Sequence, residues 1–195
     1  MQKSIKLGLV LSGGGYRGVA HIGVLKAMEE LGIKPDFISG TSAGAIVGSL
    51  YAAGCTYNEI FDVFIKTELF SYQNYTFKKP GLIDGSKIEK LLKTHLKEDS
   101  FECLKIPMFI ATTDLIDGKT HFFNKGPLIK PIIASSSVPG VFSPIVFNDL
   151  LLCDGGVTNN FPIEPLQICC DKIIGVFLNS LLETSKKQLK TTRSV

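Results

Sequence analysis

A glycine-rich loop near the start of the sequence could bind an anion. Residues 13–18, GGGYRG, follow an apolar run and precede a stretch with helical spacing. A strand, a glycine loop and a helix in this order present backbone N–H groups to a negative charge, because glycine leaves them uncovered. The anion could be a dinucleotide, a phosphate or the oxyanion of a reacting ester. A tight strand-to-helix turn would use the same glycines.

A serine lies in a second loop, in the pattern of an exposed nucleophile. GTSAG at residues 40–44 is a G-x-S-x-G sequence between an apolar run and a helical stretch. A nucleophile elbow is a strained turn, and small residues such as Gly40 and Gly44 let strand and helix approach each other. Ser42 would lie at the positive end of the helix, which favours alkoxide character. The alternative is a serine that only caps the helix.

A nucleophilic serine needs a base, and the histidines do not supply one in the usual chain order. Only His95 and His121 follow Ser42, and no histidine follows Asp154. Asp154 ends an apolar run and precedes two glycines, where a strand delivers a side chain to the carboxyl edge of a sheet. Asp154 is therefore a candidate base, although an aspartate at this place is equally typical of a turn.

The spacing of apolar residues predicts the elements that position these loops. Buried strands are expected at 5–11 and 37–40, each followed by a helix, at 16–31 and 43–53. Alternating strands and helices with short connections are typical of a parallel sheet with helices on its faces. Further helices are expected at 58–66 and 86–97, further strands at 107–113, 120–124 and 172–178, and a strand hairpin at 145–153.

Composition favours one globular domain, residues 1–195, with 45% hydrophobic and 20% charged residues. The net charge of +3 is too small to indicate nucleic-acid binding. Five cysteines without a Cys-x-x-Cys pair, and three scattered histidines, predict reduced thiols in a cytoplasmic protein and no metal site. The sequence shows neither a signal-peptide pattern nor an apolar run long enough for a transmembrane helix.

Together, GGGYRG, GTSAG and DGG resemble the patatin-like phospholipase family. ASSSVPGVFSP at 134–144 and DGGVTNNFPIEPL at 154–166 also resemble it, and the resemblance covers about residues 7–178. It implies a three-layer α/β/α sandwich with a mostly parallel central sheet. It also implies a serine acyl hydrolase of the lipase or phospholipase A type, which needs no cofactor and no metal.

The resemblance assigns roles to individual residues. Ser42 is the expected nucleophile and Asp154 its general base, in a Ser-Asp dyad that works through an acyl-enzyme. The expected oxyanion loop consists of Gly13, Gly14, Gly15, Arg17 and Gly18. The expected supporting residues are Gly40, Gly44, Gly155, Gly156 and Asn160.

Several readings of the function stay open. The substrate is expected to be a lipid or another acyl ester, and the choice between phospholipase, lysophospholipase and simple esterase is not made. A non-lipid esterase and a catalytically inactive lipid-binding module of the same fold are alternatives. A Rossmann-type nucleotide-binding protein is disfavoured, because the second strand ends in GTSAG instead of an acidic residue for the ribose.

Two expectations concern the surroundings of the site. The aromatic and lysine-containing stretch 69–81 suits a lid or a peripheral contact with a membrane surface. The polar, basic tail at 183–195 follows the last strand closely, which suggests a shortened C-terminus. Because an aspartate of ordinary pKa is a poor base at neutral pH, a dry site should raise the pKa of Asp154. The candidate apolar walls of that site are Val138, Phe142, Val157 and Phe161.

Overall fold

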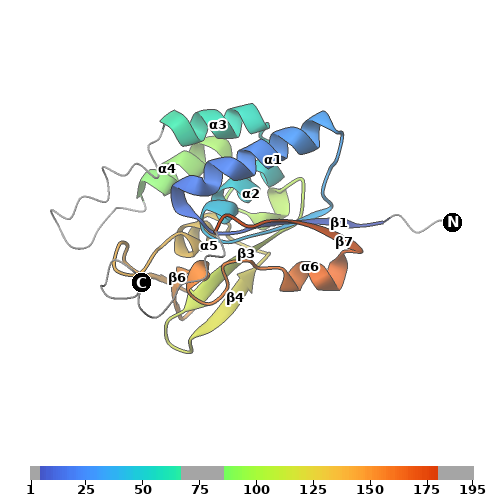
Figure 1. Ribbon diagram of the computed structural model, residues 1–195. Coiled ribbons are helices and arrows are strands. Elements are labelled where there is room, and N and C mark those ends of the chain that lie inside the picture. Colours follow the sequence, from blue (N-terminus) through green and yellow to red (C-terminus); the bar gives the residue numbers. More distant parts are fainter. Residues whose placement is uncertain (1–4, 67–85, 180–195) are drawn as a thin grey trace, which may run out of the picture.

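The computed structural model describes residues 5–66 and 86–179, which form a central sheet of seven strands with helices on its faces (Figure 1). The stretch 69–81 and the tail 183–195 lie outside the described residues. The strands are β1 (Leu7–Leu11), β2 (Phe37–Gly40), β3 (Met108–Asp114), β4 (Lys119–Phe123), β5 (Ile145–Phe147), β6 (Leu150–Asp154) and β7 (Lys172–Val176).

Helices connect most of these strands. The α-helices are α1 (Val19–Glu30), α2 (Ala43–Ala53), α3 (Tyr57–Lys66), α4 (Ser86–His95), α5 (Ile129–Ser135) and α6 (Glu164–Cys169). The short 3-10 helices are η1 (Gly15–Gly18), η3 (Phe101–Cys103) and η4 (Gly155–Val157). Helix α2 packs directly on β1, β2 and β3, and α1 and α3 lie outside it (Figure 1). Helix α6 covers the opposite face of the described sheet (Figure 1).

The sheet confirms the predicted fold class and adds a detail of strand direction. The order is β5-β6-β3-β2-β1-β7, and β4 pairs with β3 off this path. Strands β7, β1, β2 and β3 run parallel, as the alternating pattern predicts. Strands β4, β5 and β6 form antiparallel pairs. The sheet is therefore mixed, because the hairpins after β3 and β5 replace helical crossovers.

Two strands meet end to end along one side of β3. Ile110 of β3 pairs with Gly40 of β2 on one side and with β4 on the other. Thr112 pairs with Asp154 of β6 and also with β4, so β6 lies on the same side as β2. Since β6 runs antiparallel to β3, its last residue, Asp154, faces the end of β2. This register brings Asp154 close to Ser42, which follows β2.

The core lies between the sheet and α2. Every residue of α2 from Ala43 to Ala52 is buried, and side chains from the central strands pack against it. Gly48 of α2 lies against Met108 and Ile38, since a Cβ there would be 2.8 Å and 3.1 Å from their side chains. Burying this apolar surface is the main stabilising contribution to the position of the loops at the strand ends.

The predicted elements agree closely with the structure except in two places. The glycine loop ends in the 3-10 turn η1, so α1 begins at Val19 instead of residue 16. Helix α6 was not predicted, because its six residues are too few for a periodic pattern. None of the helices in the described ranges is long and apolar enough to cross a membrane.

Candidate active site

Ser42 occupies a strained turn between β2 and α2. Its backbone has φ 53° and ψ −120°, a positive φ that side-chain-bearing residues rarely adopt. Such a conformation costs about 1–3 kcal/mol and persists where the surrounding structure enforces it. The Ser42 side chain does not cap α2, so the simple helix-cap interpretation of the sequence is wrong.

Glycines allow this turn to form. A Cβ on Gly44 would collide with the backbone carbonyl of Leu11 in β1, and a Cβ on Gly40 would lie 2.6 Å from the carbonyl oxygen of Gly44. A Cβ on Gly155, just after β6, would collide with the carbonyl of Ala111. The G-x-S-x-G spacing therefore lets α2 start directly against the sheet edge.

Asp154 lies beside Ser42 and is almost completely buried. The Ser42 side chain lies close enough to this carboxylate to lower its pKa, and Oδ1 accepts a hydrogen bond of 2.7 Å from the N–H of Gly156. Ser42 and Asp154 are only 7% and 6% exposed. Burial raises the pKa of Asp154 above the ordinary 3.8, and these two contacts oppose that rise. The site thus places a serine hydroxyl beside a carboxylate with increased basicity.

The expected walls of the site are only partly correct. Val138 and Val157 are 39% and 54% exposed, so they do not seal Asp154 from water. The backbone of Asp154 is enclosed by β3 and by the segment after α5: its N–H donates to Ser137, and its carbonyl accepts from the Thr113 hydroxyl. The pKa of Asp154 is raised by burial, as expected. However, Val138 and Val157 do not provide that burial.

Ser135 fixes the turn at Ser42. The backbone N–H of Ser42 donates to the Ser135 hydroxyl at 2.9 Å, and that hydroxyl donates to the carbonyl of Ala111 at 2.6 Å. This chain links the turn to α5 and β3. Ser135 lies in the ASSSVPGVFSP segment that resembles the family, which was the signal in the sequence, but no spacing rule indicates its contact with Ser42.

The glycine loop lies against Ser42. A Cβ on Gly13 would lie 3.2 Å from the Ser42 Cβ and would collide with the Asn160 side chain. The N–H of Gly13 donates to the Asn160 carbonyl at 3.1 Å. Within the described part of the chain, the N–H groups of Gly14 and Gly15 have no hydrogen-bond partner. These two glycine N–H groups are therefore available to bind an anion.

The other residues of the expected loop have different contacts. The Arg17 guanidinium donates to the Asn179 side chain at 3.2 Å and lies over the Tyr16 ring, so it braces the loop against the segment after β7. A Cβ on Gly18 would lie 2.9 Å from the Cβ of Ala43, so Gly18 allows the loop to pack on α2. Neither residue presents a group to Ser42 in these contacts.

The loop after Asp154 is held by residues that sequence analysis only partly identified. The Thr41 hydroxyl donates to the carbonyl of Asn159 at 3.0 Å, and the Asn159 amide donates to Glu164 at 2.9 Å. The expected supporting residue Asn160 lies next to it, with its side chain against Gly13 and Gly156. Thr41 lies in the serine motif itself, but no spacing rule predicts its partner in a distant loop.

The two later histidines are engaged elsewhere. His95 donates to the carbonyl of Leu91 within α4 at 2.9 Å. His121 lies in β4, with Nε2 3.7 Å from Asp117. A serine-histidine arrangement is therefore not supported by either position.

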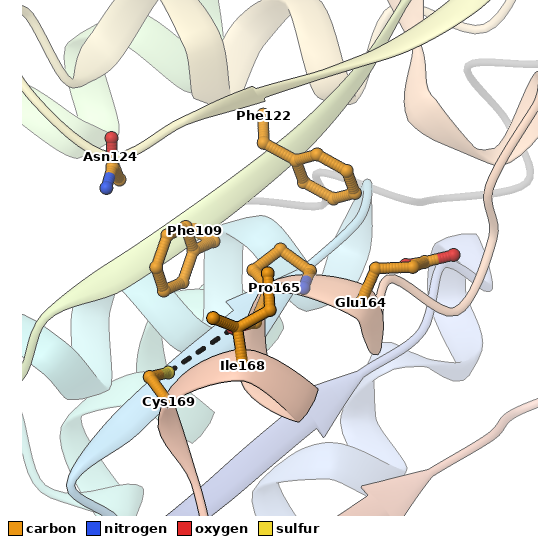
Figure 2. Close-up of a pocket in the computed structure, with 7 residues that line it drawn as sticks. All are labelled: Phe109, Phe122, Asn124, Glu164, Pro165, Ile168 and Cys169. Carbon is orange, nitrogen blue, oxygen red and sulfur yellow. Dashed lines mark hydrogen bonds between the residues drawn. The ribbon is translucent and has the colours of Figure 1, made fainter.

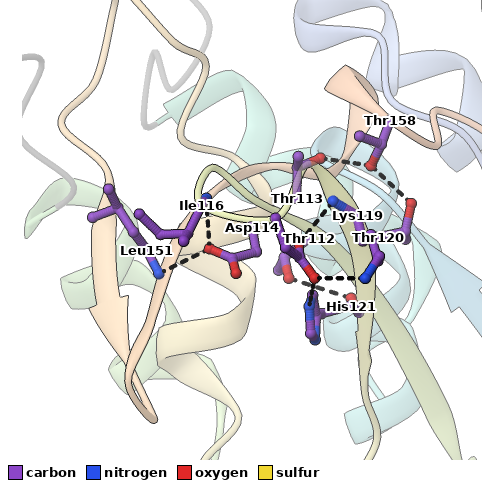
Figure 3. Close-up of polar contacts among 10 residues, drawn as sticks. Thr112, Thr113, Asp114, Ile116, Lys119, Thr120, His121, Leu151 and Thr158 are labelled. Carbon is purple, nitrogen blue, oxygen red and sulfur yellow. Dashed lines mark hydrogen bonds and ion pairs between the residues drawn. The ribbon is translucent and has the colours of Figure 1, made fainter.

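A group of possible metal ligands lies in the β3–β4 hairpin. Asp114, Asp117 and His121 have ligand atoms within 4.8 Å of one another. However, Oδ1 of Asp114 accepts hydrogen bonds from the N–H groups of Ile116 and Leu151 (Figure 3). Asp117 also accepts a backbone hydrogen bond in the same turn. These carboxylates hold the hairpin, and we assign them to that structural role.

An apolar pocket of about 390 Å³ lies between α6 and the sheet. Phe109 of β3 and Phe122 of β4 face Pro165 and Ile168 of α6 across it (Figure 2). Its lining contains none of the residues of the serine turn, the glycine loop or Asp154. The pocket is therefore separate from the candidate site.

Comparison with known families identifies the family to which the chain belongs. A family model described as patatin-like phospholipase matches residues 9–166. The chain belongs to this family. The matched range of the patatin-like phospholipase model contains the glycine loop, the serine turn and Asp154. At the level of the family, this supports hydrolysis of lipid esters.

Relatives of this patatin-like phospholipase chain are longer proteins. An uncharacterized NTE family protein of Mycobacterium tuberculosis is 34% identical over 90% of the chain and 50% of its own length. Lysophospholipase NTE1 of Mycosarcoma maydis is 30% identical over 97% of the chain and 10% of its own length. The chain thus spans about half, or much less, of these curated relatives. The crystal structure of VipD from Legionella pneumophila shares the fold, with a TM-score of 0.60 at 15% identity over 82% of this chain and 47% of VipD.

Proposed function

We propose that the protein is a serine acyl hydrolase that cleaves carboxylic ester bonds of lipids with a Ser42–Asp154 dyad. The observation that carries this proposal is a serine in a strained turn beside a buried carboxylate, which the strand register brings to the same sheet edge and whose pKa is raised by burial. Strained backbone of this kind is concentrated at functional sites. A residue with a shifted pKa in contact with a nucleophile is also typical of catalysis.

In the first step, Asp154 acts as the general base. It removes the proton of Ser42 while Oγ forms a bond to the ester carbonyl carbon. The carbonyl π electrons move to the oxygen and give a tetrahedral oxyanion. When the carbonyl re-forms, the C–O bond to the alcohol breaks, and Asp154 returns the proton to the leaving oxygen. Ser42 then carries the acyl group.

In the second step, water releases the acid. Asp154 removes a proton from water, the hydroxide oxygen attacks the acyl carbon, and Ser42 leaves as the alcohol with the proton from Asp154. The unpaired N–H groups of Gly14 and Gly15 are the proposed donors to both oxyanions. Each such donor contributes about 3–4 kcal/mol to transition-state stabilisation. The Gly13 N–H is not assigned this role, because Asn160 already accepts it.

The proposed substrate is a lipid with an accessible acyl ester. The family and the name of the Mycosarcoma maydis relative, a lysophospholipase, support this class. Contact with a membrane surface would follow from such a substrate and remains a part of the proposal. No described residue set calls for a metal in the mechanism, so we expect full activity in chelator.

The test is hydrolysis of p-nitrophenyl esters of increasing acyl length by the wild type, Ser42→Ala and Asp154→Asn. Ser49→Ala removes another buried serine hydroxyl in α2, and Asp117→Asn removes an exposed carboxylate, so these two serve as controls. We expect a loss of at least about 10³-fold in kcat for the site variants and near wild-type rates for the controls. Equal activity of Ser42→Ala and the wild type would refute the dyad.

The same series separates the alternatives. A wild type that prefers short acyl chains and ignores lipid substrates would indicate a non-lipid esterase. A folded wild type that binds vesicles without hydrolysing any ester would indicate a lipid-binding module.

A further inference from the structure

His21 is a fully buried titratable residue that the proposed dyad does not use. It lies in the first turn of α1, with 0% exposure, and its Nε2 is 2.8 Å from the carbonyl oxygen of Ser12. Its other ring nitrogen, Nδ1, is buried and has no hydrogen-bond partner in the described part of the chain. A buried polar atom without a partner costs about 1–3 kcal/mol, so a purely structural position would favour an apolar side chain.

The contact determines the protonation state of this histidine. A carbonyl oxygen only accepts hydrogen bonds, so Nε2 carries the proton and Nδ1 has a free lone pair. Burial lowers the pKa of His21, and the hydrogen bond to Ser12 opposes that shift. The ring is therefore neutral at neutral pH. Its donor faces the backbone of the glycine loop, which makes it unsuitable as a base for Ser42.

The carbonyl that His21 binds belongs to a peptide held on both sides. On its N–H side, Gly13 donates to the Asn160 carbonyl at 3.1 Å. The Ser12 N–H donates to Val176 at 3.1 Å, and the Ser12 hydroxyl donates to the Gly13 carbonyl at 3.0 Å. Each backbone polar group from the Ser12 N–H to the Gly13 carbonyl thus has a partner. The next N–H groups along the chain, at Gly14 and Gly15, have no partner among the described residues.

We propose that His21 is a positioning residue for the oxyanion loop: its Nε2–H fixes the Ser12–Gly13 peptide and so aims the N–H groups of Gly14 and Gly15 at the acyl oxygen. The inference rests on the proposed hydrolase function for its catalytic consequence. The three other hydrogen bonds named above come from the sheet edge, the segment itself and the loop after Asp154. His21 adds a contact from α1, the helix that directly follows the loop.

A loop without this contact would still fold over Ser42 but would hold its donors less accurately. Oxyanion donors act only when they are aligned with the charge that develops in the transition state, and small displacements are costly. Substrate binding does not need that alignment. Loss of the His21 contact should therefore lower kcat and leave KM almost unchanged.

The experiment compares His21→Gln with His21→Phe. Glutamine carries its amide nitrogen the same number of bonds from Cβ as Nε2 of histidine, so it can donate to Ser12. Phenylalanine fills the space of the ring without a donor. Met28→Ala serves as the control, because it removes buried volume from the same helix and has no role in the site. All variants are assayed with p-nitrophenyl butyrate for kcat and KM, together with thermal unfolding.

We expect His21→Phe to lose about 10–100-fold in kcat with KM within about twofold. His21→Gln should recover most of that loss. Met28→Ala should lower the melting temperature while kcat stays close to the wild-type value. A His21→Phe variant with wild-type kcat, or a Gln variant as impaired as the Phe variant, would overturn the proposal.

Amide hydrogen exchange at Gly13 provides a readout that does not depend on turnover. His21→Phe should speed exchange of this amide by at least about tenfold, and His21→Gln and Met28→Ala should not, because local opening is governed by the contacts of the segment. Unchanged exchange in His21→Phe would overturn the positioning role even if the enzyme is active. The two proposals can fail separately. Faster Gly13 exchange in His21→Phe, found together with a wild type that hydrolyses no ester, would uphold the loop contact and refute the proposed hydrolase.

Discussion

The strained backbone of Ser42 leads to a reversal of the usual order of alanine and glycine in stability. Ser42→Ala and Ser42→Gly both remove the hydroxyl beside Asp154, so that loss cancels between them. They differ in the backbone. Alanine keeps the penalty of φ 53°, whereas glycine adopts this conformation without a clash between Cβ and the backbone.

The expected size follows from two opposing terms. Relief of the strained conformation favours the glycine variant by about 1–3 kcal/mol. The greater freedom of glycine in the unfolded chain opposes this by about 0.5–1 kcal/mol. Ser42→Gly should therefore be more stable than Ser42→Ala by about 1 kcal/mol, and neither variant should hydrolyse esters.

A matched pair within α2 provides the control. Ser49 is buried in the interior of α2, and its hydroxyl donates to the Ala45 carbonyl. In a regular helix the glycine variant should be less stable than the alanine variant by about 1 kcal/mol. The sign of the difference should thus reverse between Ser42 and Ser49.

Urea denaturation followed by circular dichroism measures both differences, and thermal unfolding should show a shift of about 2–4 °C for each. An alanine variant at Ser42 that is as stable as the glycine variant would refute the reasoning, because it would mean that the turn stores no strain at this residue.

Three further predictions follow from named contacts. Because burial raises the pKa of Asp154 above 3.8, the ionised carboxylate destabilises the fold. The stability of Asp154→Asn relative to the wild type should therefore rise as pH increases from 3.8 through the raised pKa of Asp154. Urea titrations at several pH values measure this difference. The pKa of His21 is lowered below 6.5, so wild-type stability should fall as pH drops below about 6.5, and His21→Gln should reduce this fall in the same titrations. Gly44→Ala should destabilise by at least about 2 kcal/mol, since its Cβ would meet a β1 carbonyl, whereas Gly23→Ala, in open space on α1, should stabilise by about 1 kcal/mol in thermal unfolding.

Local sequence patterns were sufficient for the elements around the serine. The run FISG and the small, apolar stretch 43–53 become β2 and α2 with the expected bounds, because strand length and helix capping there agree with the hydrophobic pattern. The final glycine of that helix, Gly54, has φ 102°, as a helix C-cap requires. Here local and tertiary preferences point to the same structure.

Contacts between distant segments could not be read in the same way. The meeting of β2 and β6 depends on the register that each of them makes with β3. The two strands themselves are separated by more than 100 residues of sequence. The hydrogen bond from the Ser42 N–H to the Ser135 hydroxyl, and that from the Thr41 hydroxyl to the Asn159 carbonyl, join elements that no spacing rule connects. Sequence analysis therefore names the candidate chemical groups, while the tertiary structure specifies which donors remain unpaired.

The assignment of the oxyanion donors illustrates this difference. A glycine run suggests several equivalent N–H groups, but the structure pairs that of Gly13 with Asn160 and leaves those of Gly14 and Gly15 unpaired. The Arg17 side chain also has a partner that the motif does not indicate. It donates to Asn179, because the segment after β7 passes beside the loop. The proposed donors are thus defined by what surrounds the motif.

The central claim, that Ser42 is a nucleophile activated by Asp154, is tested most directly by an alkyl fluorophosphonate and intact-protein mass spectrometry. Attack by Ser42 Oγ on phosphorus releases fluoride and adds one phosphonyl group, which peptide mapping locates. We predict labelling of the wild type at Ser42, no labelling of Ser42→Ala, and labelling of Asp154→Asn slowed by at least about 10²-fold. Labelling at another residue, or equal rates in the wild type and Asp154→Asn, would contradict the account.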